Sequence, residues 1–255
     1  MIKTFSTATV ILNHGSQDPA GILEFKKAFK IFESLTPQSV ITYGFLELTC
    51  PTISDALTYV TQFPINSIIL IQSFLLHATH TQNDIPGILK HFSHQHPNYP
   101  ITLSKPLCSN PRIPELIQSA IEAVEHTSQT PIPRENTHVI FVGRGTSVPS
   151  ANSWSFEVAE QLQSIMKFGR ISVAFAASVD PKLQKALEQA FSAKPQRIII
   201  VPLLLWSGAL YQQIIHRTQL GQTQQPDIEW LCTPPLGTHP LLPHIWQDLA
   251  RAITE

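Results

Sequence analysis

Three side chains that can bind a divalent metal follow apolar stretches in the first half of the chain. His14 follows the segment TVILN, Glu47 follows VITYGFL, and His80 lies shortly after IILIQSFLL. Imidazole and carboxylate groups are suitable ligands for Fe(II), Co(II) or Ni(II), and both can also accept a proton near neutral pH. These residue types therefore favour metal chemistry coupled to proton transfer.

The apolar stretches have the length and composition of buried β-strands, and amphipathic segments separate them. Apolar residues spaced by three, four and three positions line one face of the first such segment: Ile22, Phe25, Phe29 and Phe32. We expect strands over 8–13, 39–46, 67–76 and 101–104, each followed by a helix. Ile-, Leu- and Val-rich strands that alternate with helices predict parallel sheets covered on both faces. Because ligands bind at the carboxyl ends of such strands, the three metal-binding side chains are expected to share one edge.

The second half of the chain repeats the first. A shift of 130 residues aligns TVILNHGSQDP, which ends at Pro19, with VIFVGRGTSVP, which ends at Pro149; it also aligns 51–57 with 181–187, and 67–76 with 197–206. The shift then slips by one, where PLCSNPRIP at 106–114 meets PLGTHPLLP at 235–243. The fold expected is two duplicated, doubly wound α/β lobes that face a central cleft. The expected domains are 1–126 and 137–255, because 127–136 is rich in Pro, Thr and Ser.

The repeat provides an internal control for the three side chains. The equivalents of His14, Glu47 and His80 are Arg144, Ala177 and Leu210. Framework residues persist in both copies: Gly15 and Gly145, Pro51 and Pro181, Leu57 and Leu187. A scaffold that keeps its packing residues and holds the polar trio in one copy suggests that the trio performs chemistry. The second lobe is expected to form the opposite wall of the cleft.

Three of these segments resemble the motifs of class II chelatases, specifically the sirohydrochlorin cobalto- and ferrochelatases. They are HGSQDP at 14–19, FLEL with a following proline at 45–51, and HTQNDIP at 80–86. The second half contains VPLLLWSGA and PLGTHP, which are also similar to family sequences, so the resemblance covers nearly the whole chain. The chain resembles the long, fused form of the family. QSFLLHAT departs from the family, which favours a Pro and small Gly residues there.

The resemblance implies a metal chelatase, a lyase that inserts Fe2+ or Co2+ into sirohydrochlorin in sirohaem or cobalamin biosynthesis. It makes His14 and His80 the metal-handling histidines and Glu47 an acidic family position. Two histidines and a carboxylate leave coordination positions open, which suits metal transfer better than a closed structural site does. The metal is then a substrate, and no permanently bound cofactor is expected.

Carboxylates of the macrocycle are expected to pair with Arg144 and with helix N-termini near Ser16 and Thr146. His77 lies three residues before His80 and competes for its role. The cluster His91, His94 and His96 is interpreted as the end of a helix rather than as part of the site. First-row metals share these ligands, so the sequence does not choose among iron, cobalt and nickel; the lack of a His-rich tail after Glu255 favours iron slightly. A tetrapyrrole or metal carrier without turnover is the alternative function.

Composition narrows the remaining functions and partners. Charged residues make up 14% of the chain and the formal net charge is -1, without a block of like charge, which disfavours nucleic-acid binding. No apolar run approaches the roughly 20 residues of a membrane span, and the N-terminus lacks a signal peptide, so a cytoplasmic protein is expected. Cys50, Cys108 and Cys232 form neither a disulfide pattern nor a zinc motif. A fused chain already contains both lobes, which favours a monomer.

Overall fold

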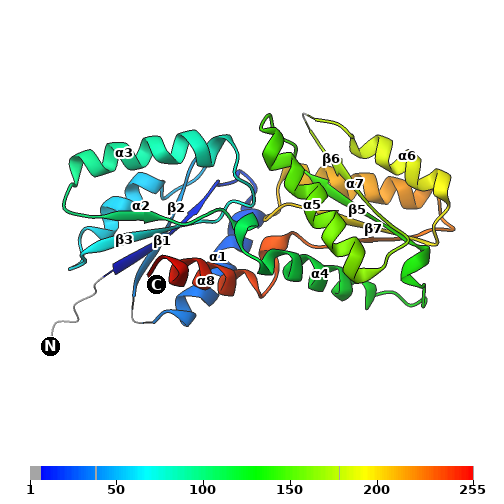
Figure 1. Ribbon diagram of the computed structural model, residues 1–255, viewed down its shortest axis with the longest axis horizontal. Helices are drawn as coiled ribbons and strands as arrows, with labels where there is room; N and C mark the ends of the chain where they lie inside the picture. Colours follow the sequence, from blue (N-terminus) through cyan, green and yellow to red (C-terminus); the bar gives the residue numbers. More distant parts are fainter. Residues whose placement is uncertain (1–6, 38, 178, 255) are drawn as a thin grey trace. The chain divides into compact units, whose positions relative to one another are not determined.

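The computed structural model describes residues 7–37, 39–177 and 179–254, and these ranges contain two parallel β-sheets (Figure 1). The first sheet has the order β2-β1-β3-β4 and the second has the order β6-β5-β7-β8. The strands are β1 (Thr7–Asn13), β2 (Val40–Phe45), β3 (Ser67–Gln72), β4 (Ile101–Leu103), β5 (Thr137–Gly143), β6 (Arg170–Phe175), β7 (Arg197–Pro202) and β8 (Glu229–Cys232). The two equal strand orders confirm the duplicated, doubly wound fold predicted from the sequence.

Eight α-helices connect and cover the strands in the described ranges. They are α1 (Pro19–Leu35), α2 (Ile53–Val60), α3 (Ile85–Gln95), α4 (Arg112–Glu125), α5 (Pro149–Met166), α6 (Leu183–Ala193), α7 (Ala209–Gln224) and α8 (Leu242–Thr254). Short 3-10 turns lie at Leu107–Ser109, Arg134–Asn136 and Leu236–Thr238. Within these ranges, none of the helices is both long and apolar enough to cross a membrane.

Each sheet is buried between helices, as expected for parallel strands. In the first sheet, Ala8, Val10 and Leu12 of β1 pack with buried residues of α2 and α3. In the second sheet, Ile140 and Val142 of β5 pack in the same way with α6 and α7. Burial of this apolar surface supplies most of the free energy that holds each sheet together.

Strand β3 ends at Gln72, four residues before the expected end at 76. The apolar run continues, but its backbone changes partner. The N–H groups of Leu107 and Cys108 donate to the carbonyls of Phe74 and Leu75, at 3.0 and 2.9 Å. The second sheet repeats this arrangement, with Leu236 and Gly237 donating to residues 204 and 205. Apolar composition alone does not reveal that a 3-10 turn replaces the neighbouring strand.

The compact units differ from the domains expected from the sequence. The first unit consists of 1–110 and 240–255, and the second consists of 111–239. The domains 1–126 and 137–255 stay a prediction; the compact units group α4 with the second sheet and α8 with the first. Both crossings, 110/111 and 239/240, fall within the duplicated PLCSNP and PLGTHP segments.

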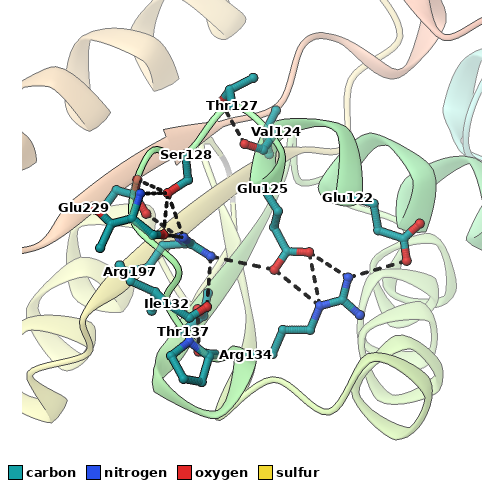
Figure 2. Close-up of polar contacts among 12 residues, drawn as sticks. Glu122, Val124, Glu125, Thr127, Ser128, Ile132, Arg134, Thr137, Arg197 and Glu229 are labelled. Carbon is teal, nitrogen blue, oxygen red and sulfur yellow. Dashed lines mark hydrogen bonds and ion pairs between the residues drawn. The ribbon is translucent and has the colours of Figure 1, made fainter.

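An ion-pair network around the buried Arg197 holds α4 and the following segment in the second unit (Figure 2). Arg197 of β7 is 3% exposed and pairs with Glu229 of β8, and its Nη1 lies 3.8 Å from Glu125 of α4. Arg197 also donates to Ser128 Oγ at 2.9 Å, while Arg134 donates to Glu125 at 2.7 Å. Buried charges need partners of this kind. These contacts bind the segment 127–136 to the second unit, so it is not a free linker.

Helix α8 completes the core of the first unit. Trp246 is fully buried, and its ring lies 6.0 Å from Phe25 and 5.9 Å from Phe32, both on α1. Figure 1 shows α8, in red, beside α1, in blue, although the two helices lie near opposite ends of the sequence. The equivalent residue of α4, Ile117, is fully buried in the second unit, where α4 packs against α5 and β8.

The exchange of α4 and α8 predicts where core mutations act. Trp246→Ala should destabilise the first unit by about 3–5 kcal/mol, because it leaves a large cavity beside α1. Its matched control, Ile117→Ala, should destabilise the second unit by about 2–5 kcal/mol, although Ile117 lies in the first sequence repeat. Hydrogen exchange read by mass spectrometry should rise over α1 and β3 in the first variant and over α5 and β8 in the second. The opposite pattern would refute the exchange.

Candidate active site

Backbone pairing between β1 and β2 continues past the ends of both strands. The N–H of Leu46 donates to the carbonyl of Asn13 at 2.8 Å, and the N–H of Glu47 donates to the carbonyl of His14 at 3.0 Å. His14 and Glu47 are thus neighbours on adjacent chain segments at the carboxyl edge of the sheet. Their side chains can meet because the backbone already holds their residues together.

Gly15 allows this close approach. Its φ is +96°, and a Cβ at this position would collide with the carbonyl oxygen of Glu47. That carbonyl also accepts a hydrogen bond from the N–H of Thr49 at 2.9 Å, which closes a tight turn around Leu48. Glycine has no Cβ and adopts positive φ without strain, so it fits the position where other residues do not.

His80 begins a π-helical turn, His80–Asp84, that leads into α3. The N–H of Ile85 donates to the carbonyl of His80, which is the i to i+5 bond of a π-helix. The next residue, Pro86, has no N–H to donate, and its ring would clash with the carbonyl four residues earlier in a regular α-helix. Pro86 therefore favours the wider turn that carries His80.

The three side chains converge at one edge, as expected. His14 Nε2 lies 3.2 Å from Glu47 Oε1, and the rings of His14 and His80 are 4.8 Å apart in an edge-to-face arrangement. One ligand atom from each residue lies within 4.8 Å of the others. Both histidines are half-buried and Glu47 is exposed. Two imidazoles and one carboxylate at this spacing can hold a divalent ion and leave coordination positions open.

A fourth residue, Asp84, was not identified from the sequence. Its Oδ2 lies 2.7 Å from Nδ1 of His80, across the π-helical turn. A carboxylate four residues after a histidine in a helical segment is the sequence signal that points to such a contact. Asp84 itself lies outside the group of three candidate metal ligands.

The other candidate histidines do not join this group. His77 is exposed, and its Nδ1 lies 3.2 Å from Thr81 Oγ1. His91 and His94 lie on the exposed side of α3, and His96 ends that helix with its ring stacked on Phe92 at 4.5 Å. Among the described residues, the group formed by His14, Glu47 and His80 brings three candidate ligands together, and no second group does so.

The second unit has the same backbone arrangement at its strand ends with different side chains. The N–H of Ala177 donates to the carbonyl of Arg144 at 3.0 Å, and Gly145 again has a positive φ, +84°. Arg144 is exposed. Leu210 lies in the first turn of α7, which begins as a regular α-helix. The backbone arrangement at the strand ends is therefore duplicated, and the π-helical turn and the candidate metal ligands are not.

The two hydroxyl residues expected to contact carboxylates lie in capping turns. Ser16 Oγ accepts from the N–H of Asp18 at 3.0 Å, and Asp18 in turn caps α1 through Ala20. The N–H of Thr146 donates to Asn152 Oδ1 at 3.0 Å. These backbone donors are thus engaged within the protein. A hydroxyl oxygen that accepts one bond can still donate its own hydrogen, so Ser16 and Thr146 stay candidates through their side chains.

The collision at Gly15 predicts an asymmetry between the two copies. Gly15→Ala should push the Glu47 loop away from His14 and weaken Co2+ binding by at least about tenfold, since even the loss of an outer partner of a metal ligand costs about that much. Gly145→Ala is the matched control, because its Cβ would meet the Val179 side chain at 3.0 Å rather than collide with backbone. Titrations of both purified variants with Co2+ test this expectation; equal affinities would contradict it.

Comparison with known proteins finds the same family in both repeats of the chain. The CbiX family model matches residues 8–124 and again residues 138–253. The sirohydrochlorin cobaltochelatase of Priestia megaterium is 23% identical over 248 residues, covering 97% of this chain and 80% of that protein. The sirohydrochlorin ferrochelatase of Bacillus subtilis (strain 168) is 25% identical over 251 residues, covering 96% of this chain and 90% of that protein.

A solved structure shows the same fold. The structure of SirB from Bacillus subtilis with Fe3+ has a TM-score of 0.83 and 21% sequence identity, and the match covers 97% of this chain and 95% of that chain. The family model matches both repeats and therefore most of the chain. The protein belongs to the CbiX family.

Proposed function

We propose that this protein is a sirohydrochlorin chelatase that inserts Fe2+ or Co2+ into sirohydrochlorin. The observation that carries the proposal is the convergence of His14, Glu47 and His80 within 4.8 Å at a strand-end edge of a CbiX family member. Relatives along nearly the full chain are named sirohydrochlorin cobaltochelatase and sirohydrochlorin ferrochelatase. The metal is a substrate in this reaction, so the site has to bind it and then release it.

The geometry suits a transfer site. Three protein ligands leave positions open for the pyrrole nitrogens, so the metal can gain bonds to the macrocycle before it loses those to His14 and His80. Insertion also removes two protons from the pyrroles. As the metal departs, the imidazoles regain their lone pairs and can accept these protons. Glu47, 3.2 Å from His14 Nε2, stabilises the positive charge that a proton brings to that ring.

Carboxylates of the macrocycle require cationic or hydroxyl partners, and we assign Arg144, Ser16 and Thr146 to this role. The strand-end region of the second unit supports the choice of Arg144. Three acidic positions of the first unit have uncharged or basic counterparts there: Asp18 corresponds to Val148, Glu47 to Ala177 and Asp55 to Lys185. In addition, Thr52 corresponds to the basic Lys182, whereas Asp180 is an added acid. The smaller negative charge around Arg144 reduces the repulsion of an anionic ligand and so favours its binding there.

The choice of metal and the biological setting stay predictions. Fe2+ and Co2+ use the same imidazole and carboxylate ligands, and nickel or a related tetrapyrrole is the alternative substrate. A monomeric state and a cytoplasmic location also stay predictions. A carrier that binds the tetrapyrrole or the metal without turnover is the alternative function, because the same three ligands can bind and deliver a metal.

The metal site predicts which replacements stop the reaction. His14→Ala and His80→Ala should each lower the rate of metal insertion by about 100-fold or more, since each removes both a ligand and a proton acceptor. The rate is measured from the change in absorbance when sirohydrochlorin and Co2+ or Fe2+ are mixed with the protein, relative to metal without protein.

Leu210→Ala is the matched control, because Leu210 occupies the position of His80 in the second copy. It should retain insertion activity far above that of the histidine variants. If the unchanged protein does not accelerate insertion, it is not a chelatase; a shift of the bound pigment spectrum without turnover would instead identify a carrier.

Arg144 generates a separate prediction about the substrate. Arg144→Glu should raise the KM for sirohydrochlorin by about tenfold or more, the scale of one lost charge-assisted hydrogen bond, and should leave Co2+ affinity unchanged. Arg170→Glu makes the same change of charge at the exposed amino end of β6 and should have little effect. Equal KM values for the two variants would exclude a local role for Arg144.

A further inference from the structure

Asp84 contacts the candidate metal ligand His80 and has no role in the function proposed so far. Its Oδ2 lies 2.7 Å from His80 Nδ1, a short distance for an N–H···O bond and typical of one to a charged acceptor. The side chains are partly exposed, His80 by 34% and Asp84 by 48%, so the contact is not forced by close packing of the core. It is a specific polar contact on one turn.

The second copy of the fold lacks the whole arrangement. His80, Asp84 and Pro86 correspond to Leu210, Ile214 and His216. Ile214 is buried in the apolar core, and α7 runs through these positions without a π-helical turn. The carboxylate, the histidine and the wider turn thus occur together in the copy that has the metal ligands. This joint occurrence indicates that the turn serves His80.

The chemistry of the contact fixes the state of the ring. A carboxylate accepts hydrogen bonds and does not donate them, so Nδ1 of His80 has to carry the hydrogen. In a neutral imidazole the other nitrogen, Nε2, then carries the lone pair. A metal binds to that lone pair, and the bond to Asp84 also limits rotation of the ring.

We propose that Asp84 is a positioning residue that holds His80 in the Nδ1–H tautomer and presents Nε2 to the metal. The inference rests on the proposed function, since it assigns Asp84 to the same metal-handling site. The π-helical turn that Pro86 favours sets the spacing between the two side chains. Asp84 acts through His80 and does not itself bind the metal or the macrocycle.

The proposal predicts a graded loss of metal affinity. Asp84→Ala removes the acceptor and should weaken Co2+ binding about 10- to 100-fold, the usual effect of losing an outer carboxylate partner. Asp84→Asn keeps an oxygen acceptor without the charge and should fall between Asp84→Ala and the unchanged protein. In insertion assays the KM for metal should rise in the same order, while the KM for sirohydrochlorin stays constant.

Asp18→Asn is the matched control. Asp18 lies in the loop that follows His14 and caps α1, and asparagine caps helices equally well. This variant removes one negative charge near the site without touching the contact to His80. If it weakens Co2+ binding as much as Asp84→Asn does, the effect is one of charge, and the positioning role is wrong.

The decisive measurement reads the tautomer directly. Long-range 1H–15N NMR correlations of the metal-free protein, at a pH where imidazole is neutral, should show His80 as Nδ1–H in the unchanged protein. Asp84→Ala should shift it toward Nε2–H, which free imidazole side chains prefer. An Nε2–H ring in the unchanged protein, or an unaltered tautomer in both Asp84 variants, would overturn the proposal.

The NMR result does not depend on turnover. If the unchanged protein shows the expected tautomer but inserts no metal, the proposed function fails and the role of Asp84 toward His80 stands. If insertion occurs and the tautomer is unaffected by Asp84, the reverse holds. Circular dichroism of each variant verifies folding, and Asp84→Asn provides the test if the alanine variant does not fold.

Discussion

The site depends on backbone pairing that continues beyond the strands. The bond from Glu47 to the His14 carbonyl brings a carboxylate and an imidazole to the same point, and Gly15 is the residue that lets the two segments approach. The second copy keeps this constraint, with Ala177 bonded to the Arg144 carbonyl. The backbone pairing is thus common to both copies. The copies differ in their side chains at this edge and in the π-helical turn that carries His80, which α7 does not repeat.

Much of this organisation could be predicted from the sequence because it is periodic or local. Apolar strands and amphipathic helices show their buried faces through spacing, and the shift of 130 residues gives both sheets the same order. The rule that ligands bind at the carboxyl ends of parallel strands was sufficient to predict that His14, Glu47 and His80 lie at one edge of the sheet. Their roles in turnover stay predictions.

Other features could not be predicted, because spacing shows that a face is buried but not what covers it. Ile117 and Trp246 lie on similar amphipathic helices, and nothing in that pattern shows that each packs in the unit of the other repeat. The segment 127–136 has the composition of a linker, yet Arg197 holds it by contacts from residues far away in the sequence. Asp84 lies four residues after His80, but the sequence did not show that these residues form a helical turn that brings the two side chains together.

The exchange of terminal helices has a consequence for biosynthesis. A ribosome makes β1 to β4, and with them all three candidate metal ligands, before it makes any of the second sheet. The first unit nevertheless lacks Trp246, and thus the side chain that fills the space beside Phe25 and Phe32, until 240–254 have emerged. Incomplete chains consequently present metal ligands on an unfinished core. In the order of synthesis, the last side chain to fill the core beneath the candidate site therefore follows the whole second sheet.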